Sequence, residues 1–122
     1  GLVAFDFGDA IRAGANTAAE DERDLSNVAL DIDKFEAFTR GFLGVDKDAL
    51  TEAEIDSLAG GALAMTVECG VRFLTDYLDG DKYFSVDYET HNLVRARCQL
   101  ALAKDMLAHF DEMKEIVKKY AE

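Results

Sequence analysis

The segment FDFGDAIR (5–12) carries two aspartates, Asp6 and Asp9, which are three residues apart and would share one face of a helix. Two carboxylates at this spacing could bind Mg²⁺, and the letters D-F-G also occur in the metal-binding motif of protein kinases. Aspartate is equally a common residue at the start of a helix, where it caps backbone N–H groups and complements the helix dipole. We favour capping for Asp6.

A second candidate is the series Glu68, Arg72 and Asp76, whose spacing of four places all three side chains along one line of a helix. An arginine held between two carboxylates is oriented, and an oriented guanidinium suits bidentate recognition of ligand oxygens. The alternative is an exposed ladder of ion pairs, each worth only a few tenths of a kcal/mol. Spacing alone favours the exposed ion pairs over a binding site for ligand oxygens.

Other reactive residue types lack a recognisable arrangement. The acidic run at 20–24 could chelate a cation, but a solvated acidic loop is the simpler interpretation. Cys69 and Cys98 match neither a zinc motif nor a disulfide framework, and we expect free thiols. His91 and His109 have no neighbours that indicate a catalytic dyad or a metal site. We therefore assign no catalytic and no metal-binding residue.

The elements that must position these side chains are all predicted to be helices. A first helix starts at Asp6 or Asp9 and runs to about Ala19, with the small residues at 10, 14 and 18 inside. A second is capped by Asp33 and stops at Gly44. Thr51 with Glu54 forms a capping box for a third helix, which Gly60-Gly61 loosens or breaks.

The second half of the chain reads as two long helices joined by a loop. A fourth helix covers 62–81, apolar on two sides and therefore central, and the loop 79–90 holds two tyrosines and a phenylalanine. Thr90 caps a last helix that continues to about Tyr120. The apolar residues of that helix recur every three or four positions, which fits either the core face of a bundle helix or a coiled-coil seam.

The chain has 122 residues, a length that suits one domain, and a formal net charge of −12. Such a surface repels nucleic acids and anionic membranes, so we expect neither as a partner. We also find no membrane-spanning run of about 18 apolar residues and no leader peptide, and predict a cytoplasmic protein. The apolar start, GLVAF, has no initiator methionine and indicates a fragment of a longer protein.

Several blocks in order resemble one protein family across almost the whole chain. They are GLVAFDFGDAIRAGANTAAEDERDLS, FEAFTRGFL, MTVECGVRFLTDYLDGDKYF and NLVRARCQLALAKDM. Together they resemble the C-terminal part of N-acetylhexosamine 1-kinases, which belong to the aminoglycoside phosphotransferase and choline kinase superfamily. The resemblance implies an all-α helical bundle, over residues 1–122, equivalent to the C-terminal helical lobe of a protein-kinase-like fold.

In that superfamily, a glycine and a D-[FLI]-[GA] segment follow the catalytic loop and the metal-binding aspartate. Gly1 and Asp6 match these later positions. The resemblance therefore implies that Asp6 caps a helix and braces the catalytic loop. The catalytic groups and the nucleotide-binding lobe would lie outside this chain, together with the sites for ATP and Mg²⁺.

The same resemblance implies that the chain keeps part of a sugar site. The arginine of RFLTDYL and the tyrosine of the following YF contact the sugar in those kinases, and they correspond to Arg72 and Tyr83. Glu68 and Asp76 would support the arginine. The family's tryptophan near the sugar has no counterpart, because this chain has no Trp, and the sugar preference stays open.

Three functions follow as hypotheses. The first is the sugar-binding helical part of an ATP-dependent N-acetylhexosamine kinase, inert as this chain and completed by a missing N-terminal lobe. The second is a free-standing helical interaction protein that self-associates through exposed helix faces, the stripe at 93–120 in particular. The third is a metal-binding acidic module.

Overall fold

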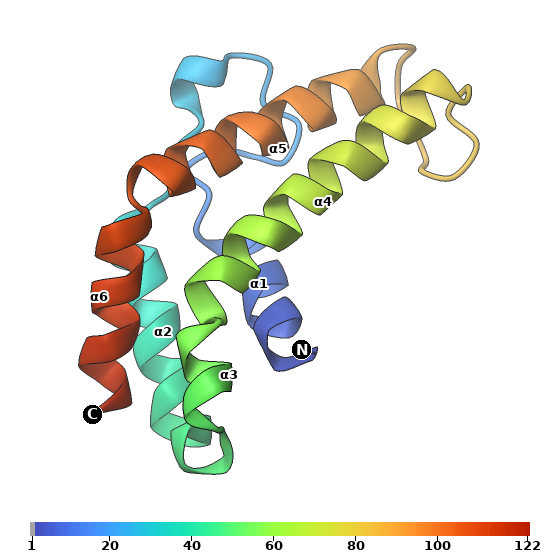
Figure 1. Cartoon of the computed structure of the whole chain (residues 1–122). Coiled ribbons are helices and arrows are strands. Elements are labelled where there is room, and N and C mark those ends of the chain that lie inside the picture. Colours follow the sequence, from blue (N-terminus) through green and yellow to red (C-terminus); the bar gives the residue numbers. More distant parts are fainter. Residues whose placement is uncertain (1) are drawn as a thin grey trace.

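A computed structural model describes residues 2–122, in which helices alternate with short connections and no β-strand occurs. An all-α protein is therefore confirmed (Figure 1). The elements are α1 (Leu2–Gly14), η1 (Leu25–Asn27), α2 (Ile32–Asp46), η2 (Lys47–Ala49), α3 (Glu52–Asp56), α4 (Leu58–Leu78), α5 (His91–Ala108) and α6 (Phe110–Ala121). Gly1, which the family resemblance assigned to a motif, lies outside the described residues.

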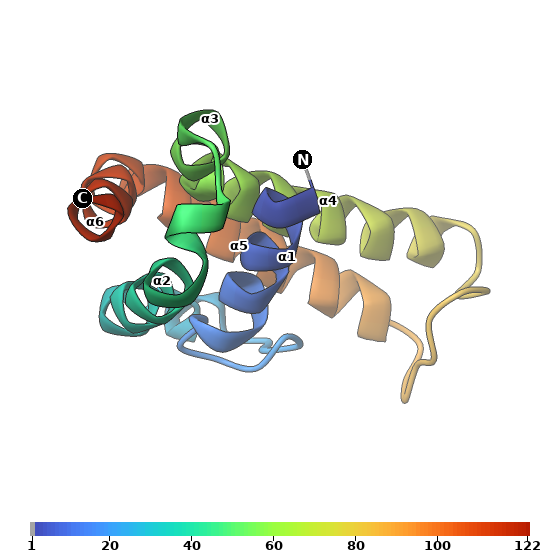
Figure 2. The ribbon, with the colours of Figure 1, turned by 90° about the horizontal axis from the view of Figure 1, so that it is seen from below.

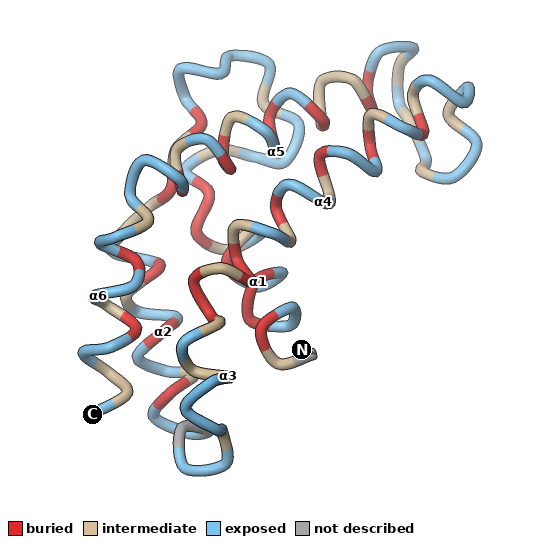
Figure 3. The backbone as a smooth tube through the Cα atoms, in the orientation of Figure 1, coloured by how far each residue is buried: buried red, intermediate tan, exposed pale blue. Residues whose placement is uncertain are grey.

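The long helices α4 and α5 run antiparallel and form an arm, whose far end carries the loop 79–90 (Figure 1). Seen from below, α1 crosses beneath this arm, and α2 with α6 forms a second group of helices at the near end (Figure 2). The buried residues concentrate where the two groups meet, whereas the loop is largely exposed (Figure 3). The largest fully buried apolar side chains are Phe35, Ile11, Leu43, Leu58, Leu102, Met106 and Met113.

The crossing of α1 over α4 is a contact between backbones. A Cβ atom added at Gly8 would lie 2.6 Å from the carbonyl oxygen of Gly61, and one added at Gly61 would lie 2.6 Å from that of Ala4. Such distances exclude any side chain at either position unless the helices move apart. Small residues therefore do bring α1 close to α4, but at this crossing they are Ala4 and Gly8. Of the set at 10, 14 and 18 that the sequence suggested, Gly14 makes a close approach to a different helix, because a Cβ atom added there would lie 2.5 Å from the ring of Phe38 on α2.

The predicted helix starts were partly wrong. The helix α1 begins at Leu2, so Asp6 and Asp9 lie within it and Asp6 does not cap it; it ends at Gly14, well before Ala19. Asp31, not Asp33, caps α2, because its carboxylate accepts the N–H of Lys34. The capping box of Thr51 and Glu54 is confirmed, with both of its hydrogen bonds present.

The predictions of two helix ends and of one continuous last helix were also wrong. The helix α2 passes through Gly44, and Gly61 is buried inside α4 because it meets α1; the break falls at Ser57 instead. The last helix is interrupted at His109, whose backbone N–H donates to the carbonyl oxygen of Asp105 and whose ring nitrogen Nδ1 lies 2.9 Å from the same oxygen. The stripe at 93–120 therefore cannot form one straight seam.

By length and composition alone, α4 could cross a membrane, although it is not an uninterrupted run of apolar residues. A core helix can meet the same test, and α4 packs on both α1 and α5. The packing covers only part of α4. Its stripe of Val67, Val71 and Leu78 remains exposed, contrary to the expectation of a helix buried on two sides.

The α1–α4 crossing yields a matched pair of substitutions on neighbouring residues. Gly61→Ala should lower the free energy of unfolding by roughly 1–3 kcal/mol, because the new methyl group forces the backbones of α1 and α4 apart. Gly60→Ala, whose Cβ meets nothing within 4 Å, should raise it by roughly 0.5–1 kcal/mol through helix propensity. Urea denaturation followed by circular dichroism measures both. Equal effects of the two variants would contradict a tight crossing.

Candidate functional site

The best-defined site lies at the far end of the arm, where the C-terminal turns of α4 meet the loop 79–90. The chain leaves α4 through a Schellman motif: the N–H of Gly80 donates to the carbonyl of Tyr77, and that of Asp81 to the carbonyl of Asp76. Gly80 and Asp81 both have positive φ, 93° and 61°, as this reversal requires. The following residues therefore fold back alongside the helix.

Asp76 fixes the position of the returning loop. Its carboxylate accepts the backbone N–H groups of Tyr83 at 2.8 Å and Phe84 at 3.0 Å. It also accepts the side-chain amide of Asn92, the second residue of α5, at 2.8 Å. The residue is buried, so these bonds replace the water that a carboxylate otherwise needs. One side chain thus joins α4, the loop and α5.

The same hydrogen bonds set the charge state of Asp76. The N–H of Phe84, together with those of Tyr83 and the Asn92 amide, holds its pKa below the ordinary value of 3.8, although burial opposes this shift. The loop anchor is therefore ionised at neutral pH. Asn92 in turn donates to Asp81 and accepts from Arg95, which also donates to the carbonyl of Ser85.

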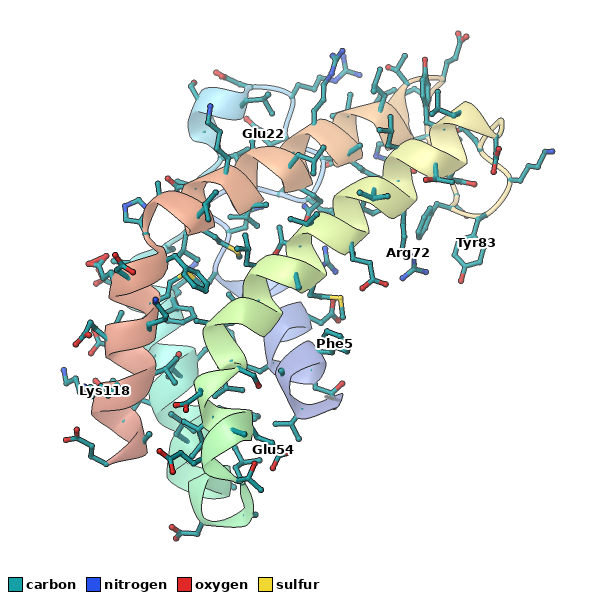
Figure 4. The ribbon with its side chains drawn as sticks, viewed as in Figure 1. Phe5, Glu22, Glu54, Arg72, Tyr83 and Lys118 are labelled. Atoms are coloured by element: carbon teal, nitrogen blue, oxygen red, sulfur yellow. The ribbon has the colours of Figure 1, made fainter. Side chains whose placement is uncertain are left out.

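Arg72 lies one turn before Asp76 and projects from the lower edge of the arm beside Tyr83 (Figure 4). Its guanidinium carbon lies 6.0 Å from the centroid of the Tyr83 ring and 5.9 Å from that of Phe84. Both distances suit a cation–π interaction. Phe84 packs against Phe73 of α4, with the ring centroids 4.7 Å apart, while Tyr83 is 74 % exposed.

The expected ladder of ion pairs is not formed. Within the described chain, no ion pair joins Arg72 to Glu68 or to Asp76. The reason is that Asp76 turns toward the loop backbone, and Glu68 is exposed. Asp76 therefore positions the aromatic wall next to Arg72 instead of pairing with the guanidinium. Asp6, expected as a support residue, is exposed on α1 and does not line the hollow that contains Arg72 and Tyr83.

Together these residues form an open hollow of about 380 Å³, lined by Arg72, Thr75, Asp76, Asp79, Tyr83 and Phe84. Its volume lies at the small end of the usual range for ligand pockets. The wall offers guanidinium donors, a free carboxylate on Asp79, two hydroxyl groups and aromatic faces. This combination suits a small ligand that carries many hydroxyl groups and an apolar face.

A second polar cluster joins the acidic segment at 20–24 to the start of α5. The buried His91 donates from Nε2 to the carboxylate of Asp21 at 2.8 Å and accepts the N–H of Asp87 at Nδ1. Its ring stacks on Tyr88, and the guanidinium carbon of Arg23 lies 4.5 Å from the centroid of the Tyr88 ring. Both ring nitrogens are occupied, so His91 has no free nitrogen to act as a base. The cluster is a structural link.

The sequence suggested a solvated acidic loop at 20–24, but several side chains of this segment have partners within the chain. Glu20 pairs with Arg12 at 2.5 Å, Glu22 accepts from Asn27, and Asp24 caps η1. The bond from His91 holds the pKa of Asp21 below its usual value. No spacing rule could have identified these partners, because His91 lies 70 residues from Asp21. Among the described residues, no group of three or more His, Cys, Asp or Glu could hold a metal ion.

Both cysteines are free, as predicted, with Cys98 buried and Cys69 half-buried. Burial raises the pKa of each thiol, so neither is an activated nucleophile. No protein-family model matches the chain. The kinase resemblance therefore stays a prediction that depends on the residues quoted for it.

Replacement of the loop anchor should loosen the loop without unfolding the helices. Asp76→Asn loses the negative charge that two backbone N–H groups share, so trypsin should cleave after the exposed Lys82 faster than in the parent protein. Asp79→Asn is the matched control, since its exposed carboxylate holds no loop N–H. Mass spectrometry of timed digests measures the cleavage. Equal rates in the two variants would contradict an anchoring role.

The contribution of the Asp76 carboxylate to stability should also depend on pH, and the direction of this dependence can be worked out. A carboxylate whose pKa is lowered by folding contributes stability above its unfolded pKa, and this contribution is lost as the pH falls through the lowered value. The amide proton shifts of Tyr83 and Phe84 should therefore stay constant from neutral pH to about pH 4 and titrate together below 3.8. Two-dimensional NMR measures this, and a common midpoint above 3.8 would contradict it.

Proposed function

We propose that the chain is the sugar-binding helical part of an ATP-dependent small-molecule kinase that phosphorylates an N-acetylhexosamine. One observation carries the proposal. Arg72 and Tyr83, the two residues that the family resemblance assigns to sugar contact, come from different elements and line the same hollow. A pyranose presents hydroxyl groups at its edge and C–H groups on its faces, which matches a guanidinium beside exposed aromatic rings.

The division of roles follows from the geometry. Arg72 would donate hydrogen bonds to ring hydroxyl or acetamido oxygens, and Tyr83 would offer its ring face and its phenol. Asp76 is a positioning residue, because it acts through the loop backbone that carries Tyr83. Asp79 offers a free carboxylate to a hydroxyl donor on the ligand.

Phosphoryl transfer needs a base that orients the acceptor hydroxyl and metal ions that neutralise the phosphates. The family resemblance assigns ATP, Mg²⁺ and the catalytic aspartate to a segment outside this chain, and the carboxylates around the hollow do not form a metal-binding group. We therefore assign no catalytic step to the carboxylates around the hollow. The chain would bind and orient the acceptor in the cytoplasm, with a kinase lobe as its partner, and would be inert alone.

An NMR titration of the 122-residue chain with N-acetylglucosamine tests the proposal. We expect weak binding, with shifts confined to the amides around the hollow. Arg72→Ala should weaken it about tenfold, the usual loss for a hydrogen bond to a charged group. Arg97→Ala, an exposed arginine on α5, is the matched control. Tyr83→Phe and Tyr83→Ala separate the phenol from the ring.

Three outcomes would overturn the proposal. They are shifts that map away from the hollow, an undiminished affinity in Arg72→Ala, and an affinity equally reduced in Arg97→Ala. ADP production by the purified chain with ATP and the sugar, unchanged in repeated preparations, would overturn the statement that it is inert alone. Because Arg72 and Tyr83 are exposed, neither variant should affect folding, and circular dichroism checks this.

A further inference from the structure

The arm has an outer face, turned away from α1, that the site described above does not use. From α4 it presents Val67, Val71 and Leu78, and from α5 it presents Leu100 and Leu107, with exposed fractions between 39 and 74 %. In Figure 1 the two helices lie side by side, with α1 and the acidic segment behind them. We name these five side chains the arm face.

The arm face is continuous across the two helices. Thr66 of α4 contacts Met106 of α5, and a Cβ atom added at Gly70 would lie 2.9 Å from the side chain of Leu100. The exposed side chains therefore sit on either side of a closely packed helix pair. They are flanked by half-buried leucines at 63, 74 and 93.

The size of the arm face fits one specific interface. With roughly 150–200 Å² for a fully exposed Val or Leu, its exposed fractions correspond to on the order of 400 Å² of apolar surface. This area matches the largest apolar patch of a typical monomer, which is often a functional surface. A standard interface buries about 800 Å² per partner, of which a little over half is apolar. The arm face alone would supply about that apolar share.

The flanking charges have opposite signs on the two helices. Beyond the α4 side of the arm face lie the exposed carboxylates of Glu68 and Asp79, and beyond the α5 side lie the exposed cations Arg97 and Lys104. The contacts of Thr66 with Met106 and of Gly70 with Leu100 set Glu68 and Lys104 at about the same level along the arm. The α4 edge also holds the exposed Arg72, so its two carboxylates leave it acidic by one charge, whereas the two cations make the α5 edge basic.

This distribution selects a second copy of the chain as the occupant. A two-fold axis parallel to the helices would place α4 of one copy antiparallel on α5 of the other and bring each acidic edge against a basic edge. An axis across the helices would instead set acidic edge on acidic edge. We infer that the chain forms a two-fold dimer through the arm face, as an antiparallel four-helix bundle with Glu68 of each copy facing Lys104 of the other.

The stripe at 93–120, proposed from the sequence as a self-association seam, differs from this surface. Ala96, Ala103 and Val117 in that stripe are buried within the chain, and the interruption at His109 turns its second half toward α2. Of the large apolar residues in that stripe, Leu100 and Leu107 are the exposed ones in the described structure. The dimer does not depend on the sugar-binding proposal, since none of the five arm-face side chains lines the hollow, although Asp79 lies at the border of both.

Sedimentation velocity between about 1 µM and 1 mM protein at 0.15 M NaCl tests the inference, because this salt screens the net charge of each copy beyond about 8 Å. We expect a monomer–dimer equilibrium. Val71→Glu and, on the other helix, Leu107→Glu should each raise its dissociation constant at least about tenfold. Val45→Glu, at a residue 84 % exposed on α2, is the matched control and should leave the constant unchanged.

A charge exchange tests the arrangement of the two copies. Glu68→Lys and Lys104→Glu should each weaken the dimer, and the double variant should recover it, because the pair is restored with its signs reversed. Four results would overturn the inference: a monomer at every concentration, a dimer insensitive to both arm-face substitutions, a double variant no tighter than the singles, or binding of the arm face to lipid vesicles by a chain that stays monomeric. Circular dichroism confirms that each variant is folded.

Discussion

The contact between the backbones of α1 and α4 is the constraint on which the remaining structure depends. Gly8 and Gly61 allow the two helices to touch without intervening side chains, and this sets the direction in which α4 leaves the core. The helix α5 then packs along α4, and the loop between them is carried to the far end of the arm. The candidate site is thus oriented by a contact at the opposite end of α4.

At the far end of the arm, the loop is held by hydrogen bonds to one carboxylate, that of Asp76, and not by a hydrophobic core. The loop 79–90 has few buried residues, so it cannot be held by apolar packing alone. Asp76 instead accepts three N–H donors from the loop and from α5, and the ring contact between Phe73 and Phe84 adds a second link between α4 and the loop. The result is a fixed wall for Arg72 in a segment that would otherwise be mobile.

Sequence patterns predicted the elements better than their ends. Apolar periodicity identified the helices, and the capping box of Thr51 and Glu54 was read correctly because its partners are local. The interruption at His109 carries no glycine or proline, and Gly61 was read as a breaker because its partner on α1 is distant in the sequence. Propensity rules describe a residue's neighbours in the chain, whereas these features depend on tertiary contacts.

The site was predictable in the same limited sense. Only the family resemblance singled out Arg72 together with Tyr83, and their role in sugar binding stays a prediction. The hydrogen-bond partners of Asp76 were not predictable, since a spacing of four equally suggests an ion pair with Arg72. Backbone N–H groups leave no signature in side-chain patterns. The links of the acidic segment were missed for a related reason, because a run of like charges gives no indication of partners elsewhere in the chain.

The link between Asp21 and His91 has a consequence for how this sequence can evolve. His91 uses one ring nitrogen as a donor and the other as an acceptor, and few other side chains offer that combination in a planar ring. A change at Asp21 leaves the buried Nε2–H of His91 without a partner, whereas a change at His91 leaves an exposed carboxylate that water can solvate. Homologues that have lost the aspartate should therefore also have lost the histidine.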